Sequence, residues 1–224
     1  MLIAEDLLLL LFDDKAGKPV DGVSNLDYSM AGAVLIELAM LGRIDVTTDA
    51  DDGKSGRLVI RDSTPTGEAT LDESLATLSK LEGKKPKDVI GPLTKGGLSQ
   101  RLLDGLVQRG ILRREQGRVL GLFPTTRWPA QDSRHEQRTR AELNRVLVDG
   151  QQPNERTTAL VALLAGMGVT KQVVGGRDPR LVERRATEIA EGNWAGDALR
   201  RAVEEITSAV MAALFVPTIV TGAT

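Results

Sequence analysis

The stretch Val34-Leu-Ile-Glu-Leu-Ala-Met-Leu-Gly-Arg-Ile-Asp-Val46 is repeated in similar form later in the chain, at Leu102-Leu-Asp-Gly-Leu-Val-Gln-Arg-Gly-Ile-Leu-Arg-Arg114. Each copy begins with apolar residues at helical spacing, reaches a glycine, and continues with residues that favour a β-strand. The glycines are Gly42 and Gly110, and a glycine just after a helix adopts the left-handed conformation without a Cβ clash. The repeat therefore predicts two units of one kind, each a helix that ends at glycine and continues into a strand.

A polar turn and a second β-prone segment follow each copy, so each unit is predicted to be a helix followed by a hairpin. Two such units in one chain favour a binding scaffold over an active site. The predicted strands cover 44–46 and 57–61 in the first unit and 111–114 and 118–123 in the second, with turns at 49–56 and Gln116-Gly117.

The rest of the chain has a helical pattern. Hydrophobic residues make up 41% of the sequence but aromatic residues only 3%, so the core is built from Leu, Val, Ile and Ala, which favours helix packing. We predict a mainly α fold, with residues 1–224 forming a single globular helical domain and one of the two hairpins protruding. Further helices are predicted up to about Phe12 and over 28–41, 72–81, 89–93, 99–109, 133–149, 154–168, 178–192 and 195–215.

The N-terminal segment Met1–Leu11 superficially resembles the apolar part of a secretion signal. It lacks a basic segment at its start, and Glu5 and Asp6 precede its run of leucines, so we predict that it is a core helix. No uncharged apolar run approaches the roughly 20 residues that are needed to cross a bilayer.

Catalytic patterns are absent from the sequence. There is no cysteine, which excludes disulfides and thiolate metal sites. The single histidine, His135, lies between charged residues in a segment predicted to be an exposed helix. No P-loop, H-E-x-x-H or G-x-S-x-G pattern occurs. The sequence therefore predicts a protein that is not an enzyme and that holds no metal or cofactor.

Charge is distributed unevenly although the net charge is only −2. Residues 1–80 carry 7 basic and 15 acidic residues, whereas residues 81–147 carry 14 basic and 7 acidic residues. The basic middle is the region expected to face an anion, either phospholipid or nucleic acid. The alternative is a solvated surface whose charges balance in three dimensions.

Several blocks of sequence resemble the Golgi phosphoprotein 3 family, and they occur in the family's order over about nine tenths of the chain. The composition, rich in Ala, Gly and Arg, suits a bacterial branch of that family. The blocks are Met1–Gly17, Gly32–Ile44, Pro65–Gly67 with Leu71–Leu75, Leu106–Leu112, Thr125-Thr126 and Arg156–Leu164.

The resemblance implies a mostly helical domain with a protruding hairpin, attached peripherally to the cytoplasmic face of a membrane. It also implies binding of phosphatidylinositol 4-phosphate, adaptor behaviour toward the tails of membrane proteins, and self-association through the hairpin. In the family, one aromatic residue and three arginines hold the headgroup. This chain has Gly22, Ala31, Gly96 and Ser99 at those positions, none of them aromatic or basic.

Neighbouring residues offer a substitute headgroup site. Tyr28 would supply an aromatic wall, and Lys95 and Arg101 flank the positions of two missing arginines. The segment that contains Ser99 begins a predicted helix, where backbone N–H groups favour phosphate. We therefore predict that Tyr28, Lys95, Ser99 and Arg101 bind an anionic lipid headgroup. The alternative is that Tyr28 lies in the core and both cations are solvated.

The second hairpin is predicted to make a further contact because it combines apolar and basic residues, which favours an anionic bilayer surface. Association with another protein molecule is the competing use of the same residues. The residues are Arg113, Arg114, Arg118, Val119, Leu120 and Leu122.

A winged-helix regulator that binds nucleic acid is the alternative function, because a winged helix also reads as helix, strand, turn and strand. The helix of the second unit offers only Gln100, Arg101 and Gln108 for reading bases, and the chain has a pI of about 5.6. Nucleic acid is therefore disfavoured as a partner. A subunit of an assembly without a ligand is the third possibility.

Overall fold

The computed structural model of the chain describes residues 1–49, 51, 54–119, 123–175, 178–192 and 197–214. Within these ranges the chain is mainly helical, with two separate two-stranded sheets. The elements are α1 (Ile3–Leu10), α2 (Leu26–Met40), β1 (Ile44–Val46), β2 (Leu58–Ile60), α3 (Ala69–Ser79), α4 (Pro86–Thr94), α5 (Leu98–Gln108), β3 (Glu115–Val119), β4 (Phe123–Arg127), α6 (Arg134–Leu147), α7 (Glu155–Gly166), α8 (Thr170–Val173), α9 (Pro179–Ala190) and α10 (Asp197–Leu214).

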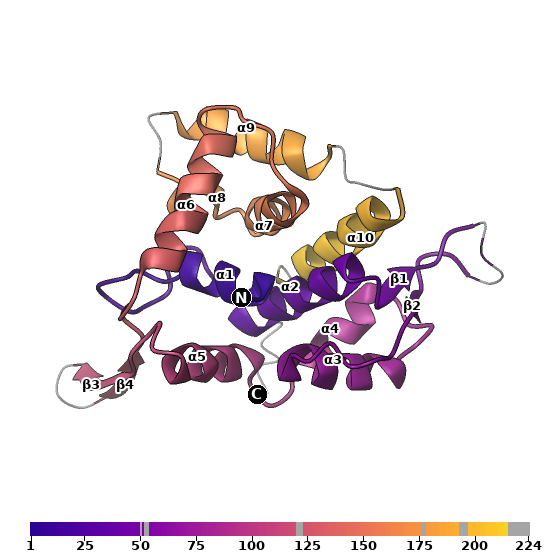
Figure 1. The fold of residues 1–224 in the computed structure, drawn as a ribbon, viewed down its shortest axis with the longest axis horizontal. Helices are drawn as coiled ribbons and strands as arrows, with labels where there is room; N and C mark the ends of the chain where they lie inside the picture. The colour runs from indigo at the N-terminus through magenta and orange to yellow at the C-terminus, as the bar shows by residue number, and fades with distance from the viewer. Residues whose placement is uncertain (50, 52–53, 120–122, 176–177, 193–196, 215–224) are drawn as a thin grey trace, which may run out of the picture.

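The helix α2 lies at the centre of the molecule, between a layer formed by α6 to α9 and a layer formed by α3, α4 and α5 (Figure 1). Its residues from Ser29 to Leu38 are all buried, because the sequence of this helix has no polar face. Gly32 allows α10 to approach closely, since a Cβ atom at this position would lie 2.3 Å from Val210 Cγ2. The apolar residues from Val34 to Met40, with which the first copy of the repeat begins, therefore belong to the central helix of the core.

The first hairpin packs against the helices. In it, β1 and β2 pair antiparallel, with Ile44 opposite Ile60 and Val46 opposite Leu58. Ile44, Val46 and Leu58 are buried, and β1 contacts α10. Gly42 has φ +65°, as predicted for a glycine that ends a helix.

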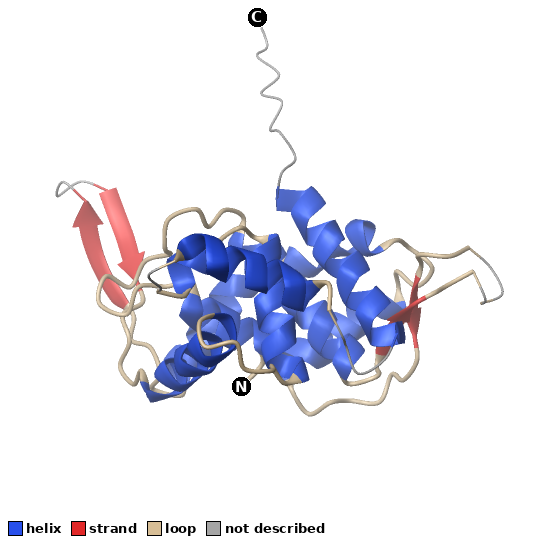
Figure 2. Ribbon diagram, turned by 90° about the horizontal axis from the view of Figure 1, so that it is seen from above, coloured by secondary structure: helices blue, strands red, loops and turns tan. Residues whose placement is uncertain are grey.

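The second hairpin stands away from the helical body (Figure 2). Its strands β3 and β4 begin later than predicted, and Gln116 and Gly117 lie within β3, paired with Thr126 and Thr125. The predicted turn at Gln116-Gly117 is therefore wrong. The predicted strand at 111–114 is also wrong, because β3 begins only at Glu115. Both strands are edges, so Pro124, which lacks an N–H group, is tolerated in β4.

The base of the second hairpin is attached to the turn after α1. The Trp128 N–H donates to the Gly17 carbonyl at 2.8 Å, and the Ala130 N–H donates to the Asp14 carbonyl at 2.9 Å. Gly17 has φ +60°, and a Cβ atom there would lie 2.4 Å from Pro129 N. The Trp128 side chain is buried, with the Arg114 guanidinium 5.4 Å from its ring centroid.

The predicted helices are confirmed, with ends shifted by a few residues, and the short α8 was not predicted. The predicted mainly α domain with one protruding hairpin is also confirmed. Among the described helices, none combines the length and the apolar character required to cross a membrane.

Candidate functional site

A pocket of about 450 Å³ opens between α3, α4 and α5. Three cations line it: Lys80 at the end of α3, Lys95 at the end of α4, and Arg101 in α5. Within the described residues, the ammonium groups of Lys80 and Lys95 form no ion pair. The other lining residues are Glu73, Ser74, Thr77, Leu81, Pro92 and Leu93.

Two consecutive glycines place Arg101 in this pocket. Gly96 and Gly97 have φ +80° and +69°, which lets the chain turn sharply between α4 and α5. Arg101 Nη1 then donates to the carbonyls of Lys95 at 3.3 Å and Gly96 at 2.8 Å. Arg101 Nε lies 3.9 Å from Glu73 Oε2 on the opposite wall, so the guanidinium is held in place before any ligand binds.

The N-terminus of α5 already has an anionic partner. The Ser99 N–H donates to Asp27 Oδ1 at 2.6 Å, so a carboxylate from the first turn of α2 lies at the positive end of α5. Tyr28, the next residue, is half-buried and packs against the core. The structure thus brings Lys95 and Arg101 into one pocket, whereas Tyr28 and Ser99 lie at the junction of α2 and α5.

The model of one protein family, Golgi phosphoprotein 3 (GPP34), matches residues 3–206 of the chain. The chain belongs to the Golgi phosphoprotein 3 family. It is 33% identical over 167 residues to vacuolar protein sorting-associated protein 74 of Eremothecium gossypii, covering 66% of this chain and 49% of that protein. The protein of the same name from Schizosaccharomyces pombe is 30% identical over 149 residues, covering 59% and 44%. The chain therefore spans about half the length of the curated relatives it matches.

Two of the four positions that the resemblance assigned to the headgroup, Gly22 and Ala31, do not line this pocket. Ala31 is fully buried within α2. Gly22 is exposed beside α8, since a Cβ atom there would lie 3.6 Å from Gln172 Nε2 and 3.8 Å from Val169 Cγ1. The other two positions, Gly96 and Ser99, adjoin Lys95 and Arg101 in the chain, and Lys80 is a member of the pocket that the sequence did not indicate.

The predicted membrane-contacting hairpin is described only in part. Arg113 and Arg114 are exposed, with Arg113 Nε 2.8 Å from Glu115 Oε1 and Arg114 Nη1 4.0 Å from Asp104 Oδ1. The side chains of Arg118 and Val119 lie outside the described part of the chain, as do Leu120 and Leu122 entirely. The prediction that these residues contact a membrane or a second molecule stays a prediction.

A partly buried cluster of charges joins α1, α2, α6 and α7, and the sequence did not indicate it. His135 is not an isolated surface residue, because its Nε2 lies 2.6 Å from Oδ1 of the buried Asp6. Arg156 Nη2 lies 2.7 Å from the other oxygen of Asp6, and Nη1 lies 3.3 Å from Glu37 Oε1. Burial raises the pKa of Glu37, although the Ile3 N–H and Arg156 oppose this effect.

Another buried carboxylate, Glu136, follows His135 in α6. Burial, together with a hydrogen bond to Asp14, raises the pKa of Glu136 to about 8, although Arg140 opposes the shift. Arg140 Nε lies 2.6 Å from Glu136 Oε1, and its other nitrogens donate to the carbonyls of Val173 and Leu10. These residues join helices, and no three His, Asp or Glu side chains of the described residues are grouped to hold a metal ion.

Proposed function

We propose that this chain is a non-catalytic peripheral membrane protein that binds anionic phospholipid headgroups and acts as an adaptor on the cytoplasmic face of a membrane. Membership of the Golgi phosphoprotein 3 family supports a role in protein sorting, which is the role named in its fungal relatives. The observation that carries the lipid part is the meeting of Lys80, Lys95 and Arg101 in one pocket.

The charges of the pocket suit a phosphate group. Lys80 and Lys95 can turn their ammonium groups toward a ligand, and Arg101 is held ready by its bonds to backbone carbonyls. Glu73 offsets one of the three positive charges, which leaves a net attraction for an anion. Because Asp27 occupies the end of α5, we propose that the headgroup enters from the side of α3 and α4.

Phosphatidylinositol 4-phosphate is the headgroup proposed by family inheritance. Its phosphomonoester carries more negative charge than the phosphodiester of an ordinary anionic lipid, so three converging cations favour it. The exposed arginines of the second hairpin would add a less specific attraction of about 1 kcal/mol for each basic residue near the surface. Self-association through the same hairpin is the competing proposal for that surface.

Flotation with liposomes tests this function. The liposomes are neutral, generally anionic, or doped with phosphatidylinositol 4-phosphate, each at low and high salt. We expect salt-sensitive binding that is strongest to the doped liposomes and that the variant Lys80→Glu with Lys95→Glu loses. Both lysines are exposed, so this variant should keep its helical circular dichroism spectrum.

A matched control separates the pocket from general charge. Lys85→Glu with Lys87→Glu changes the net charge equally, on exposed residues that do not line the pocket. Equal loss in both variants would contradict a headgroup pocket, and no binding by the unaltered chain would contradict the membrane function. Duplex DNA added as a competitor tests the nucleic-acid alternative.

A further inference from the structure

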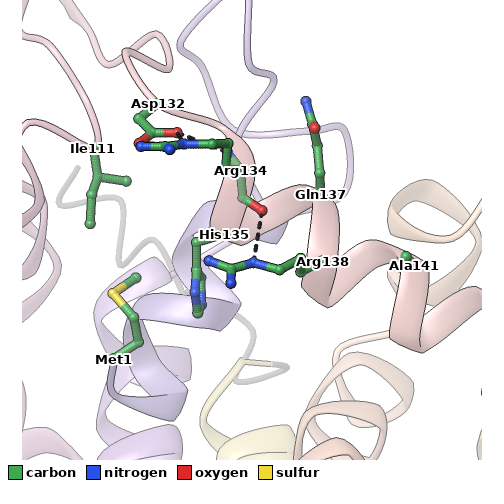
Figure 3. Close-up of a pocket in the computed structure, with 8 residues that line it drawn as sticks. All are labelled: Met1, Ile111, Asp132, Arg134, His135, Gln137, Arg138 and Ala141. Atoms are coloured by element: carbon green, nitrogen blue, oxygen red, sulfur yellow. Dashed lines mark hydrogen bonds and ion pairs between the residues drawn. The ribbon is translucent and has the colours of Figure 1, made fainter.

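A second and larger pocket, of about 780 Å³, opens beside the start of α6 (Figure 3). It lies away from the pocket of Lys80, Lys95 and Arg101 and shares no residue with it. Its walls come from α6, the segment before α6, the start of the chain and the residue after Gly110. The lining residues are Met1, Ile111, Asp132, Arg134, His135, Gln137, Arg138 and Ala141.

The two arginines of this pocket differ in their pairing. Arg134 binds Asp132 through two nitrogens, with Nη2 2.6 Å and Nε 2.9 Å from the carboxylate oxygens. This pair holds the pKa of Asp132 at about 2, so both partners stay ionised and cancel each other. Arg138 uses only Nε, which donates to the Arg134 carbonyl at 3.2 Å. Within the described residues, its two terminal nitrogens have no partner.

The acidic groups behind the pocket wall are already engaged. Asp6 binds His135 and Arg156, and Glu5 binds Arg109 and the Leu2 N–H. Their negative charges therefore do not cancel that of Arg138. The Arg138 guanidinium, which lies beside the His135 ring (Figure 3), is therefore a positive charge of the pocket that no described carboxylate pairs with.

Apolar surface lies next to this charge. The Arg138 guanidinium points toward the side of the pocket on which the side chains of Met1 and Ile111 lie, and Ala141 lies further along α6 (Figure 3). A guanidinium with two free terminal nitrogens is suited to a carboxylate, which it can bind through two parallel hydrogen bonds. A lipid headgroup is polar on all sides and would leave the apolar wall unused.

We infer that this pocket binds a short extended acidic peptide, in which a carboxylate side chain reaches Arg138 and an adjacent apolar side chain contacts Met1 and Ile111. The inference rests on the adaptor role proposed above and gives its protein partner a chemical class. The peptide pocket and the headgroup pocket would then serve a protein and a lipid at separate places on one domain.

Selection from a library of short random peptides, without any membrane, tests the inference. We expect the unaltered chain to enrich peptides with Asp or Glu beside Leu, Ile, Met or Phe. The variant Arg138→Glu should weaken binding of the selected peptides at least about tenfold. The same variant should gain binding to copies of those peptides in which Lys replaces the acidic residue.

Arg184→Glu is the matched control, because Arg184 is an exposed arginine on α9 that lines neither pocket. It should bind the selected peptides as the unaltered chain does. Lys80→Glu with Lys95→Glu should also keep peptide binding, so failure of the lipid proposal would leave this test intact. No acidic enrichment, an equal loss in Arg184→Glu, or loss of liposome binding rather than peptide binding in Arg138→Glu would overturn the inference.

Discussion

The two units of the repeat begin with the same pattern and end in different surroundings. Both have a helix, a glycine with positive φ, and an antiparallel hairpin, at α2–Gly42–β1–β2 and α5–Gly110–β3–β4. The first unit buries every residue from Ser29 to Leu38 of its helix and has buried residues in both strands. The second unit buries one face of α5 only, and the described side chains from Arg113 to Gly117 are exposed.

The difference lies in the side chains that follow the glycine. The strands of the first unit read Ile44-Asp-Val46 and Leu58-Val-Ile60, whereas β3 and β4 read Glu115-Gln-Gly-Arg-Val119 and Phe123-Pro-Thr-Thr-Arg127. Apolar strands are driven against the helices, and polar ones remain in water. Both units thus form a helix, a glycine turn and a hairpin. The polarity of the strand side chains decides whether the hairpin packs against the core or stays exposed.

The largest expected difference between the hairpins is in stability. Leu58→Ala leaves a cavity at a fully buried position, so we expect it to lower the free energy of unfolding by about 2–5 kcal/mol. Thr126→Ala, on the exposed β4, should change it by less than about 0.5 kcal/mol. Urea denaturation followed by circular dichroism measures both. Similar losses in the two variants would show that the second hairpin also supports the core.

The second difference concerns membrane attraction. Arg113→Glu with Arg127→Glu reverses two exposed charges at the second hairpin and should weaken binding to anionic vesicles by about 2 kcal/mol, or roughly thirtyfold. Lys54→Glu with Arg61→Glu makes the same change at the first hairpin, where Arg61 is already paired with Asp45. Vesicle titration at low salt compares the two, and an equal effect would mean that only net charge matters.

Glycines in the two helices provide a third comparison, with opposite signs. Gly32→Ala places a methyl group 2.3 Å from Val210 Cγ2, so we expect a loss of about 1–3 kcal/mol in stability. Gly105→Ala on α5 meets no atom within 4 Å and should add about 0.5–1 kcal/mol through helix propensity. Thermal unfolding of both variants checks the signs, and stabilisation by Gly32→Ala would mean that α10 can move away from α2.

Local pattern predicted the helices, both helix-ending glycines and the first hairpin, because each of these features depends on residues close together in sequence. The register of the second hairpin was wrong because Gln116-Gly117 has the composition of a turn, whereas pairing with Thr125 and Thr126 places it in a strand. The contact between His135 and Asp6 was not predicted because the two residues are 129 positions apart in the chain.

Only part of the candidate headgroup pocket was predicted from the sequence. Lys95 and Arg101 are close in sequence and do share a pocket, but Lys80 joins them from a different helix. The hydrogen bond between Asp27 and the start of α5 joins residues 72 positions apart, and no sequence pattern predicts it. Contacts of this length follow from the packing of whole helices, which a single sequence does not reveal.

The last comparison is the pH dependence of stability at the bases of the two hairpins, which is expected to have opposite signs. At the second hairpin, Glu136 is bonded to Asp14, whose carbonyl accepts from Ala130, and burial raises the pKa of Glu136 from 4.5 to about 8. A carboxyl group whose pKa is raised by folding stabilises the fold fully below pH 4.5 and loses this contribution as the pH rises toward 8. Glu136→Gln should therefore flatten the fall in stability between pH 5 and 8.

At the first hairpin, hydrogen bonds from Thr64 lower the pKa of Asp62, which also pairs with Arg43. A carboxylate whose pKa is lowered contributes stability above its ordinary pKa of 3.8 and loses it as the pH falls below that value. Asp62→Asn should thus alter stability only above about pH 4 and leave the slope between pH 5 and 8 unchanged. Denaturation curves at several pH values measure both variants. An unchanged slope in Glu136→Gln would mean that this carboxyl is ionised and paired with Arg140, and that the base of the second hairpin does not respond to pH in this range.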